Sequence, residues 1–389
     1  MRRIYLDHTA TTPLDPLVRD AMEPFFTETF GNASSVHWYG QQAKIALEES
    51  RATIARAIGA HSGEVYFTSG GTESDNFAIK GVAYAGRKKG KKNIITSAAE
   101  HHAVLEPCEH LIEEGFDVTV LPIDVEGRVM AGQVEKALTD STALVSIMHA
   151  NNEVGTISPV SDISHLAHER GVVVHTDAVQ SLGKIPIDVN ELQVDLMTIS
   201  AHKLYGPKGI GALYIRRGTE IESLLQGGGQ ERGRRPGTEN VPLAVGFAKA
   251  VELAVGGLTE ESNRLSAMRD ALEAKVRREF PAVIFNGHPF ERLPHILNIS
   301  FDSNKLEIEG DTLLMNMDLH GIAVTSGSAC TSGSMQPSHV LLAMGRDAKT
   351  ARATIRFAFG KSNTGADVDH VVDALREILD RMENPGCQA

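Results

Sequence analysis

The stretch Val194-Asp-Leu-Met-Thr-Ile-Ser-Ala-His-Lys203 decides the fold and the chemistry of this chain. Its first six residues predict a buried strand, and a lysine follows shortly after the strand ends. An ammonium group resists removal from water, so a lysine in this position needs a compensating reason. An amine condensed with an aldehyde supplies one, because an imine-forming lysine is how enzymes hold pyridoxal 5'-phosphate (PLP). A solvated loop lysine is the simpler alternative.

A second strand end favours the cofactor. Residues 172–176 also predict a buried strand, and Asp177 follows them about one βαβ unit before Lys203. An aspartate beside the pyridine nitrogen of PLP keeps that nitrogen protonated, which makes the ring an electron sink. The paired strand ends therefore favour a PLP site at Asp177 and Lys203 over a surface loop.

Short apolar strands alternate with helical patterns such as 103–114 and 163–170, which predicts an α/β fold. We expect a mostly parallel sheet with helices on both faces, whose ligands bind at the carboxyl ends of the strands. The seven predicted strands are 64–68, 93–97, 117–121, 143–148, 172–176, 195–200 and 211–215.

The length of 389 residues predicts two domains. Beyond a break at Gly256-Gly257, short strands (295–301, 354–359) mix with helices (311–319, 366–382). We expect residues 15–257 to form a large PLP-binding domain. Residues 1–14 and 258–389 would form a smaller α+β domain that carries the loop 325–335.

The composition predicts a cytoplasmic protein without a nucleic-acid or membrane partner. The formal net charge of -12 disfavours nucleic acid. We find no apolar run of membrane-spanning length, and we expect no secretory leader. Cys108, Cys330 and Cys387 are isolated and odd in number, which argues against a disulfide framework or a zinc site. We therefore expect a reducing compartment and no resident metal.

The stretch Ser69-Gly-Gly-Thr-Glu-Ser-Asp75 leads from a strand into a helix. Thr72 and Asp75 resemble a capping box, and Gly70 and Gly71 would let the backbone approach a ligand closely. Free backbone N–H groups and the helix dipole could then hold a phosphate, although a plain capped helix gives the same pattern. Ser200 and His202 could add donors to that phosphate.

Three polar residues follow other predicted strands. His101 could stack on a flat ring or move protons near neutral pH, although a histidine that starts a helix is common. The amide of Asn152 could hold a phenolic oxygen or a substrate carboxylate. Gln180 lies three residues after Asp177 and should face the same way.

The stretch Thr325-Ser-Gly-Ser-Ala-Cys-Thr-Ser-Gly-Ser-Met335 places a cysteine among residues that cannot build a core. We expect this loop to be exposed and mobile, which suits a reactive thiol at Cys330. A chance cysteine in a flexible loop is the alternative. Cys108 has partly apolar, helical surroundings and should be inert.

These motifs together resemble the cysteine desulfurases, which are class-V PLP enzymes with the aspartate-aminotransferase-like fold. The stretch around Cys330 resembles their long-loop subgroup, which serves iron–sulfur cluster assembly. The resemblance covers nearly the whole chain and includes Tyr5-Leu-Asp7, Gly31-Asn32, 68–76, Glu100-His101, 151–153, 177–180, His202-Lys203, 235–240, 326–330 and Ile355-Arg356.

The resemblance implies a homodimer that removes sulfur from L-cysteine, leaving L-alanine and a persulfide on Cys330. The sulfur would pass to an iron–sulfur scaffold protein or another acceptor, such as one for tRNA thiolation, and Cys330 could transiently bind a cluster with the scaffold. Lys203, His101 and Cys330 would be catalytic, and Arg356 and Asn152 would bind substrate. The implied PLP-binding residues are Gly71, Thr72, His101, Asn152, Asp177, Gln180, Ser200, His202, Lys203 and, from the other subunit, Thr238.

Two other enzymes stay open as alternatives. A selenocysteine lyase would polarise selenium at the same site. A class-V aminotransferase has no use for a thiol in a mobile loop, so Cys330 argues against it. A catalytically silent sulfur-relay protein would not need the set of Lys203, Asp177 and His101.

Overall fold

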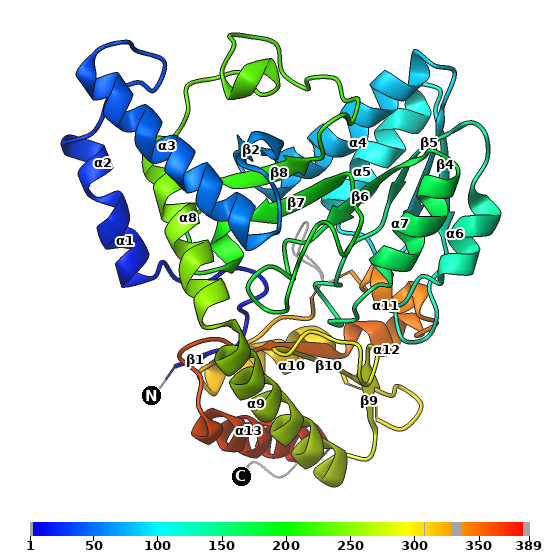
Figure 1. Ribbon diagram of the computed structural model, residues 1–389. Helices are drawn as coiled ribbons and strands as arrows, with labels where there is room; N and C mark the ends of the chain where they lie inside the picture. The colour runs from blue at the N-terminus through cyan, green and yellow to red at the C-terminus, as the bar shows by residue number, and fades with distance from the viewer. Residues whose placement is uncertain (1–2, 307, 328–335, 384–389) are drawn as a thin grey trace.

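The computed structural model describes residues 3–306, 308–327 and 336–383 (Figure 1). A seven-stranded sheet with the order β2-β8-β7-β6-β5-β3-β4 forms the middle of its larger part. β8 pairs in the antiparallel direction with β2 and β7, and all other pairs in this sheet are parallel, so the predicted mostly parallel sheet is confirmed. The strands are β2 (Val65–Thr68), β3 (Asn93–Ser97), β4 (Asp117–Leu121), β5 (Thr142–Ser146), β6 (Val173–Asp177), β7 (Leu196–Ser200) and β8 (Gly211–Ile215).

Helices cover both faces of this sheet (Figure 1). They are α1 (Pro16–Met22), α2 (Pro24–Thr27), α3 (Trp38–Ala57), α4 (Gly71–Arg87), α5 (His102–Glu113), α6 (Ala131–Ala137), α7 (Val160–Glu169) and α8 (Val241–Gly256). α4 and α5 pack on one face, whereas α3, α6, α7 and α8 pack on the other. A strand buried on both faces reads as a continuous apolar run, which explains the sequence pattern.

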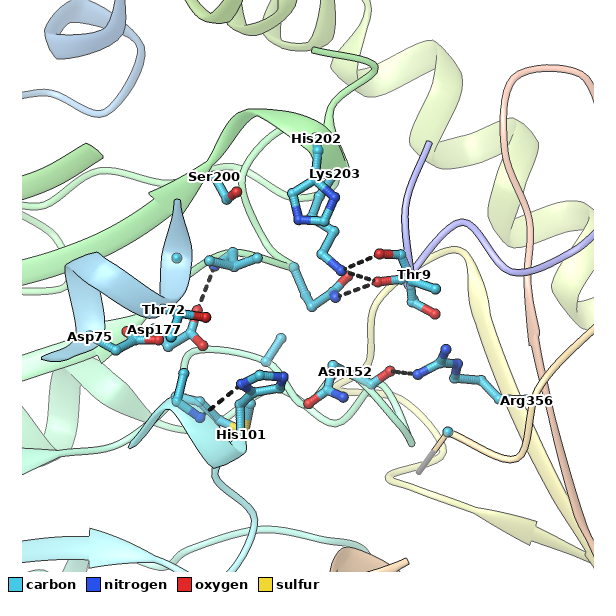
Figure 2. Close-up of a pocket in the computed structure, with 18 of the residues that line it drawn as sticks. Thr9, Thr72, Asp75, His101, Asn152, Asp177, Ser200, His202, Lys203 and Arg356 are labelled. Carbon is cyan, nitrogen blue, oxygen red and sulfur yellow. Dashed lines mark hydrogen bonds between the residues drawn. The ribbon is translucent and has the colours of Figure 1, made fainter. Parts of the chain in front are cut away.

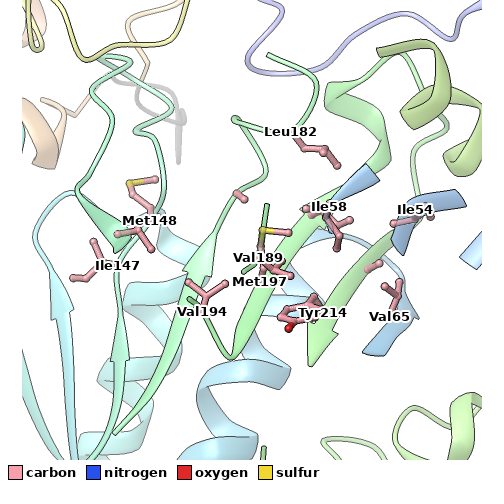
Figure 3. Packing of buried hydrophobic residues seen from close by; sticks show 14 of the residues in the cluster. Ile54, Ile58, Val65, Ile147, Met148, Leu182, Val189, Val194, Met197 and Tyr214 are labelled. Carbon is pink, nitrogen blue, oxygen red and sulfur yellow. The ribbon is translucent and has the colours of Figure 1, made fainter. Parts of the chain in front are cut away.

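Consecutive residues of β7 belong to two hydrophobic cores, one on each face of the large sheet. Leu196 packs with α4 and α5, whereas its neighbour Met197 belongs to the opposite core. Figure 3 shows Met197 and Tyr214 of the sheet in the same cluster as Ile54 of α3 and Ile58 just beyond it. This two-sided packing fixes the strand register, because a slip by one residue would exchange the two faces.

A smaller α+β part lies below the large sheet (Figure 1). Its antiparallel sheet has the order β12-β10-β9, and a separate pair joins β1 to β11 in parallel. Its elements are β1 (Ile4–Tyr5), α9 (Leu258–Glu279), β9 (Val283–Asn286), β10 (Ile296–Phe301), α10 (Gly310–Leu319), β11 (Ile322–Ala323), α11 (His339–Ala343), α12 (Ala348–Arg352), β12 (Thr354–Ala358) and α13 (Gly365–Glu383). Ile4 and Leu6 share a buried cluster with Leu272, Phe357 and Leu375.

The short helix α11 of this region contacts the hydrophobic core of the large sheet. Val340, Leu341 and Met344 of α11 and its end belong to the cluster that packs against the large sheet. The division into residues 15–257 and the two remaining segments stays a prediction.

No single helix in the described part of the chain is long and apolar enough to cross a membrane. The pair α8 and α9 passes the same test of length and composition together, with a bend of 71° between them.

Candidate active site

The loops that follow β2, β3, β5, β6 and β7 converge on a cavity of about 490 Å³ (Figure 2). Parallel strands bring their carboxyl ends to one edge of a sheet, so residues far apart in sequence meet there. The volume is in the range of small-molecule sites. The sequence-predicted residues that line the cavity are Gly71, Thr72, His101, Asn152, Asp177, Gln180, Ser200, His202, Lys203 and Arg356.

Thr238 does not line this cavity; it lies exposed on the surface of the same chain. Cys330 and Cys387 fall outside the described residues. Cys108 is buried and free, and burial raises the pKa of its thiol to about 12. The described residues hold no group of three or more His, Cys, Asp or Glu side chains suited to a metal ion.

Lys203 ends a short 3-10 turn that follows β7 and reaches back to the N-terminal segment. Its Nζ donates to the carbonyl oxygens of Thr9 at 2.5 Å and Ala10 at 2.7 Å (Figure 2). Burial, together with the charge of Arg356, lowers the pKa of the amine to about 8. The cavity therefore holds an amine that loses its proton more readily than an ordinary lysine does.

Asp177 is the last residue of β6 and is 8% exposed. Its Oδ1 accepts a hydrogen bond from the backbone N–H of Val179 at 2.8 Å. Burial raises the pKa of this carboxyl to about 6. A buried carboxyl of this kind is stabilised in its charged form by a cation beside it, which a protonated pyridine nitrogen supplies.

The predicted capping box at Thr72 and Asp75 is wrong. Gly70 is the N-cap of α4 and makes no side-chain cap, while Glu73 accepts the N–H of Ser69 at 2.8 Å. Asp75 instead lies 1% exposed among the cavity-lining residues. Burial and the nearby charge of Asp177 raise its pKa well above the usual value.

The sequence also did not predict a role for His175, which lies two residues before Asp177 on β6. His175 Nδ1 lies 2.8 Å from Ser146 Oγ, and its Nε2 lies 3.0 Å from Thr198 Oγ1. Burial lowers the pKa of His175 to about 3, so its ring is neutral. A buried histidine in mid-strand carries no sequence signal that links it to a site.

The amino end of α4 fits a phosphate group. A further cavity of about 400 Å³ opens there, lined by Gly71, Thr72, Ser200 and His202. The Ser200 hydroxyl is buried and has no hydrogen-bond partner among the described residues. A methyl group on Gly71 would come within 3.1 Å of Val179, so a larger residue would crowd this wall. An unpartnered hydroxyl beside a helix amino end suits the phosphate of PLP.

His101 caps α5 and faces the cavity (Figure 2). Its Nδ1 accepts the backbone N–H of Ala103 at 3.0 Å, so a neutral ring carries its proton on Nε2. Burial and the charge of Lys203 lower the pKa of His101 to about 4. The ring is therefore a neutral donor at physiological pH.

Arg356 comes from β12 of the smaller part and is 5% exposed. Its Nη2 donates to Asp7 Oδ1 at 2.7 Å and to Thr325 Oγ1 at 3.0 Å, and its Nη1 donates to Asn152 O at 3.0 Å. Its Nε is buried and has no partner among the described residues. Arg356 thus brings a fixed positive charge to the cavity wall.

Glu100 gives this region a testable pH dependence. It is 1% exposed, and burial raises the pKa of its carboxyl to about 8. Between the unfolded value of 4.5 and this value, the native state keeps a proton that the unfolded state has lost. The free energy of unfolding should therefore fall as pH rises through this window, by on the order of 1 kcal/mol per pH unit.

Glu100→Gln removes this titration. We expect the stability of the variant relative to the parent to increase steadily from pH 5 to pH 8, measured by urea denaturation. The control Glu109→Gln changes an exposed residue of α5 and should follow the parent at every pH. A parallel pH profile for Glu100→Gln and the parent would contradict the raised pKa.

Comparisons with known proteins agree with this geometry. The aminotransferase class-V family matches residues 4–371. The chain is 50% identical over 381 residues to cysteine desulfurase IscS of Dictyoglomus turgidum, covering 98% of this chain and 95% of that protein. It is 47% identical over 380 residues to cysteine desulfurase IscS of Clostridium botulinum, covering 97% and 94%.

Solved structures give the same result. A NifS-like protein superposes with a TM-score of 0.90 at 40% identity, covering 97% of this chain and all of that one. A NifS-like protein from Rickettsia africae gives a TM-score of 0.86 at 32% identity, with coverages of 97% and 100%.

The chain belongs to the aminotransferase class-V family, in the branch of the cysteine desulfurases. This family consists of PLP-dependent enzymes, so the family, fold and cofactor predicted from the sequence are confirmed.

Proposed function

We propose that this protein is a cysteine desulfurase: it takes sulfur from L-cysteine, releases L-alanine and passes the sulfur on through Cys330. One observation carries the proposal. A single cavity joins Lys203 and Asp177 of the large sheet to Arg356 of the smaller part. This arrangement supplies an imine-forming amine, a partner for the ring nitrogen and a cation for the substrate carboxylate.

The bound cofactor would supply an electron sink conjugated to the substrate nitrogen. Lys203, once its amine is free, removes the Cα proton of the substrate. Its lowered pKa makes the neutral amine accessible near pH 8. Lys203, which then carries that proton, can return it, while the neutral His101 can donate a hydrogen bond from Nε2 within the same cavity. Asp177 holds the charge on the ring nitrogen.

Arg356 orients L-cysteine by its carboxylate. Its guanidinium is fixed on three sides, and the unpartnered Nε leaves one donor available. Asn152 and Gln180 would hold the phenolic oxygen of the ring from the same wall. Arg356 would bind the carboxylate that all amino-acid substrates share, so possible substrates would differ only in their side chains.

Cys330 completes the reaction. Its thiolate attacks the substrate sulfur, the carbon–sulfur bond breaks, and the carbon takes up a proton. The products are L-alanine and a persulfide, so the step balances without an outside oxidant. The described residue that comes before Cys330 in the chain is Gly327, which lines the cavity.

Product analysis tests the function. With L-cysteine and a thiol reductant, the purified holoenzyme should form alanine and sulfide in equal amounts. A class-V aminotransferase would instead need a 2-oxo acid and would form no sulfide. A selenocysteine lyase would act on L-selenocysteine and leave L-cysteine unchanged, so the same assay with both substrates separates the three enzymes.

We also propose a homodimer whose sites are shared. Thr238 is exposed in its own chain, and the phosphate-side cavity opens to the surface near the amino end of α4. Around α2 and α3, large apolar side chains are exposed to an extent that suggests a protein contact. They are Phe26 at 55%, Phe30 at 64%, Val36 at 89%, Trp38 at 62% and Tyr39 at 48%.

Subunit mixing tests this assembly. Thr238→Val should bind PLP about tenfold more weakly, because one hydrogen bond to the phosphate is lost. Mixed with Lys203→Ala, it should regain parental PLP affinity in the heterodimer, where an intact Lys203 meets the partner's intact Thr238. Light scattering should report a two-fold dimer. A fully active monomer, or no recovery on mixing, would contradict the shared site.

The sulfur acceptor would be an iron–sulfur scaffold protein or a carrier for tRNA thiolation, meeting Cys330 in a reducing cytoplasm. The free and buried Cys108 supports a reducing compartment. Capture of partners from the native cell, with Cys330→Ser as the control, identifies the acceptor.

A further inference from the structure

α8 turns into α9 between the large and small parts (Figure 1). Residues at this turn help to line a separate cavity of about 320 Å³. It shares no lining residue with the catalytic cavity. Its walls combine apolar groups from Leu204, Leu253 and Ala254 with charged side chains, which are Lys184, Glu260, Glu261, Arg264 and Lys361. The assigned chemistry uses none of these residues.

Lys184 is the unusual member of this cavity. It is 7% exposed, yet its side chain donates no hydrogen bond and forms no ion pair within the part of the chain that the structure describes. Its Nζ lies 5.5 Å from the ring centroid of Tyr205. A cation–π contact alone offsets only part of the cost of burying an ammonium group. The charge of Glu261 favours the charged form of Lys184, but the two side chains form no ion pair.

Two neighbouring charged side chains have ion-pair partners of their own. Lys361 lies over the same ring, with its Nζ 4.6 Å from the centroid, and adds positive charge. Its own carboxylate partner is Asp15 at 2.8 Å. Glu261 is occupied by Arg264, which donates to its two oxygens at 2.7 and 2.8 Å. Two ammonium groups thus face one ring, and Glu261 attracts both of them while its oxygens accept from Arg264. Glu260 also lines the cavity and is exposed.

We propose that this cavity is a second ligand site that binds a small organic carboxylate. The carboxylate pairs with Lys184, whose three donors are unused, and its short alkyl part packs against Leu204, Leu253 and Ala254. This combination of one buried cation with an apolar wall selects an acid with a short hydrocarbon chain over a strongly hydrated inorganic anion.

The site lies two residues from the catalytic lysine. Tyr205 has a positive φ of 62°. Its backbone N–H donates a hydrogen bond to Thr12 Oγ1 at 2.7 Å. Its hydroxyl accepts the N–H of Lys361 at 2.7 Å. Tyr205 therefore connects this cavity to the N-terminal segment, whose carbonyls at Thr9 and Ala10 hold the Lys203 amine.

Thermal denaturation of the holoenzyme with propionate as the probe tests the site. Binding to the native state raises the melting temperature in a saturable way. Propionamide, which has the same shape without the charge, and sodium chloride at equal ionic strength should not reproduce the effect. Equal stabilisation by either of them would overturn a carboxylate site.

Lys184→Met should weaken the propionate-specific effect about tenfold or more, because a charge-assisted contact is lost. Any propionate bound at Arg356 contributes to parent and variant alike and cancels in the comparison. The control Lys249→Met removes a surface lysine of α8 that pairs with Glu252, and it should respond as the parent does. An unchanged response in Lys184→Met overturns the proposal.

A blocking variant covers the case in which Lys184→Met fails to fold. Ala254→Leu keeps the lysine and extends a larger side chain from the opposite wall. It should also lose the response to propionate while it keeps cofactor absorption and secondary structure. A full response in this variant would equally overturn the site.

Discussion

Lys203→Ala should abolish covalent trapping of PLP by borohydride and reduce alanine formation from L-cysteine at least about a thousandfold. The reason is that one side chain serves both as the covalent anchor and as the base at Cα. Its Nζ lies in the cavity and donates to the carbonyl oxygens of Thr9 and Ala10. No other described lysine lines that cavity. Mass spectrometry after reduction and the visible absorption of the cofactor report the loss directly.

The matched control is Lys208→Ala. Lys208 lies five residues further on and lines only the phosphate-side cavity. Borohydride should still trap PLP covalently on Lys203 of the Lys208→Ala variant, even where the PLP affinity of this variant falls. Circular dichroism shows whether each variant keeps its fold. Covalent trapping in Lys203→Ala would refute the assignment of this lysine.

Most strands of the large sheet were predictable because they are buried along their length, whereas β4 at the sheet edge is exposed or half-buried except at its last residue. Three of the seven predicted ranges, 93–97, 117–121 and 211–215, agree with the structure at both ends. The range 143–148 runs past the end of β5 because Ile147 and Met148 remain buried beyond the strand. An apolar run records burial, and burial continues where strand pairing has stopped.

The residues at strand ends could be predicted for a related reason. Parallel strands bring Asp177, His101 and Lys203 to one edge whatever the details of the loops. Thr9 and Ala10 could not be found in this way, because they contribute backbone carbonyls from a segment almost two hundred residues before Lys203. Nothing in their side chains marks that role.

At Asp75, tertiary packing overrides the local capping-box pattern. The pattern Thr72 to Asp75 has the spacing of a capping box, which predicts an exposed carboxylate at the helix start. The structure buries Asp75 beside Asp177 instead, since α4 begins one residue before Thr72 and turns this side chain toward the cavity. Arg356 came from the family resemblance alone, because it lies on a strand of the other part.

Cys330→Ser should leave PLP bound and L-cysteine binding intact, but it should eliminate the persulfide and reduce alanine and sulfide formation to near background. The hydroxyl of serine is a far weaker nucleophile toward sulfur than a thiolate is. The cofactor should still respond to L-cysteine with spectral changes, because Lys203, Asp177 and Arg356 are untouched. Alanine assays and mass spectrometry of the trapped persulfide measure the outcome.

Cys108→Ser provides the comparison that makes this test specific. The Cys108 side chain is 2% exposed, and its pKa of about 12 keeps it a thiol rather than a thiolate. It should therefore carry no persulfide, and its serine variant should turn over L-cysteine as the parent does. Normal alanine formation by Cys330→Ser, or a persulfide found on Cys108, would contradict the sulfur transfer while leaving Lys203 as the cofactor anchor. The pair of variants thus separates the chemistry of the cofactor from the chemistry of the thiol, and only the second distinguishes a desulfurase from an aminotransferase built on the same fold.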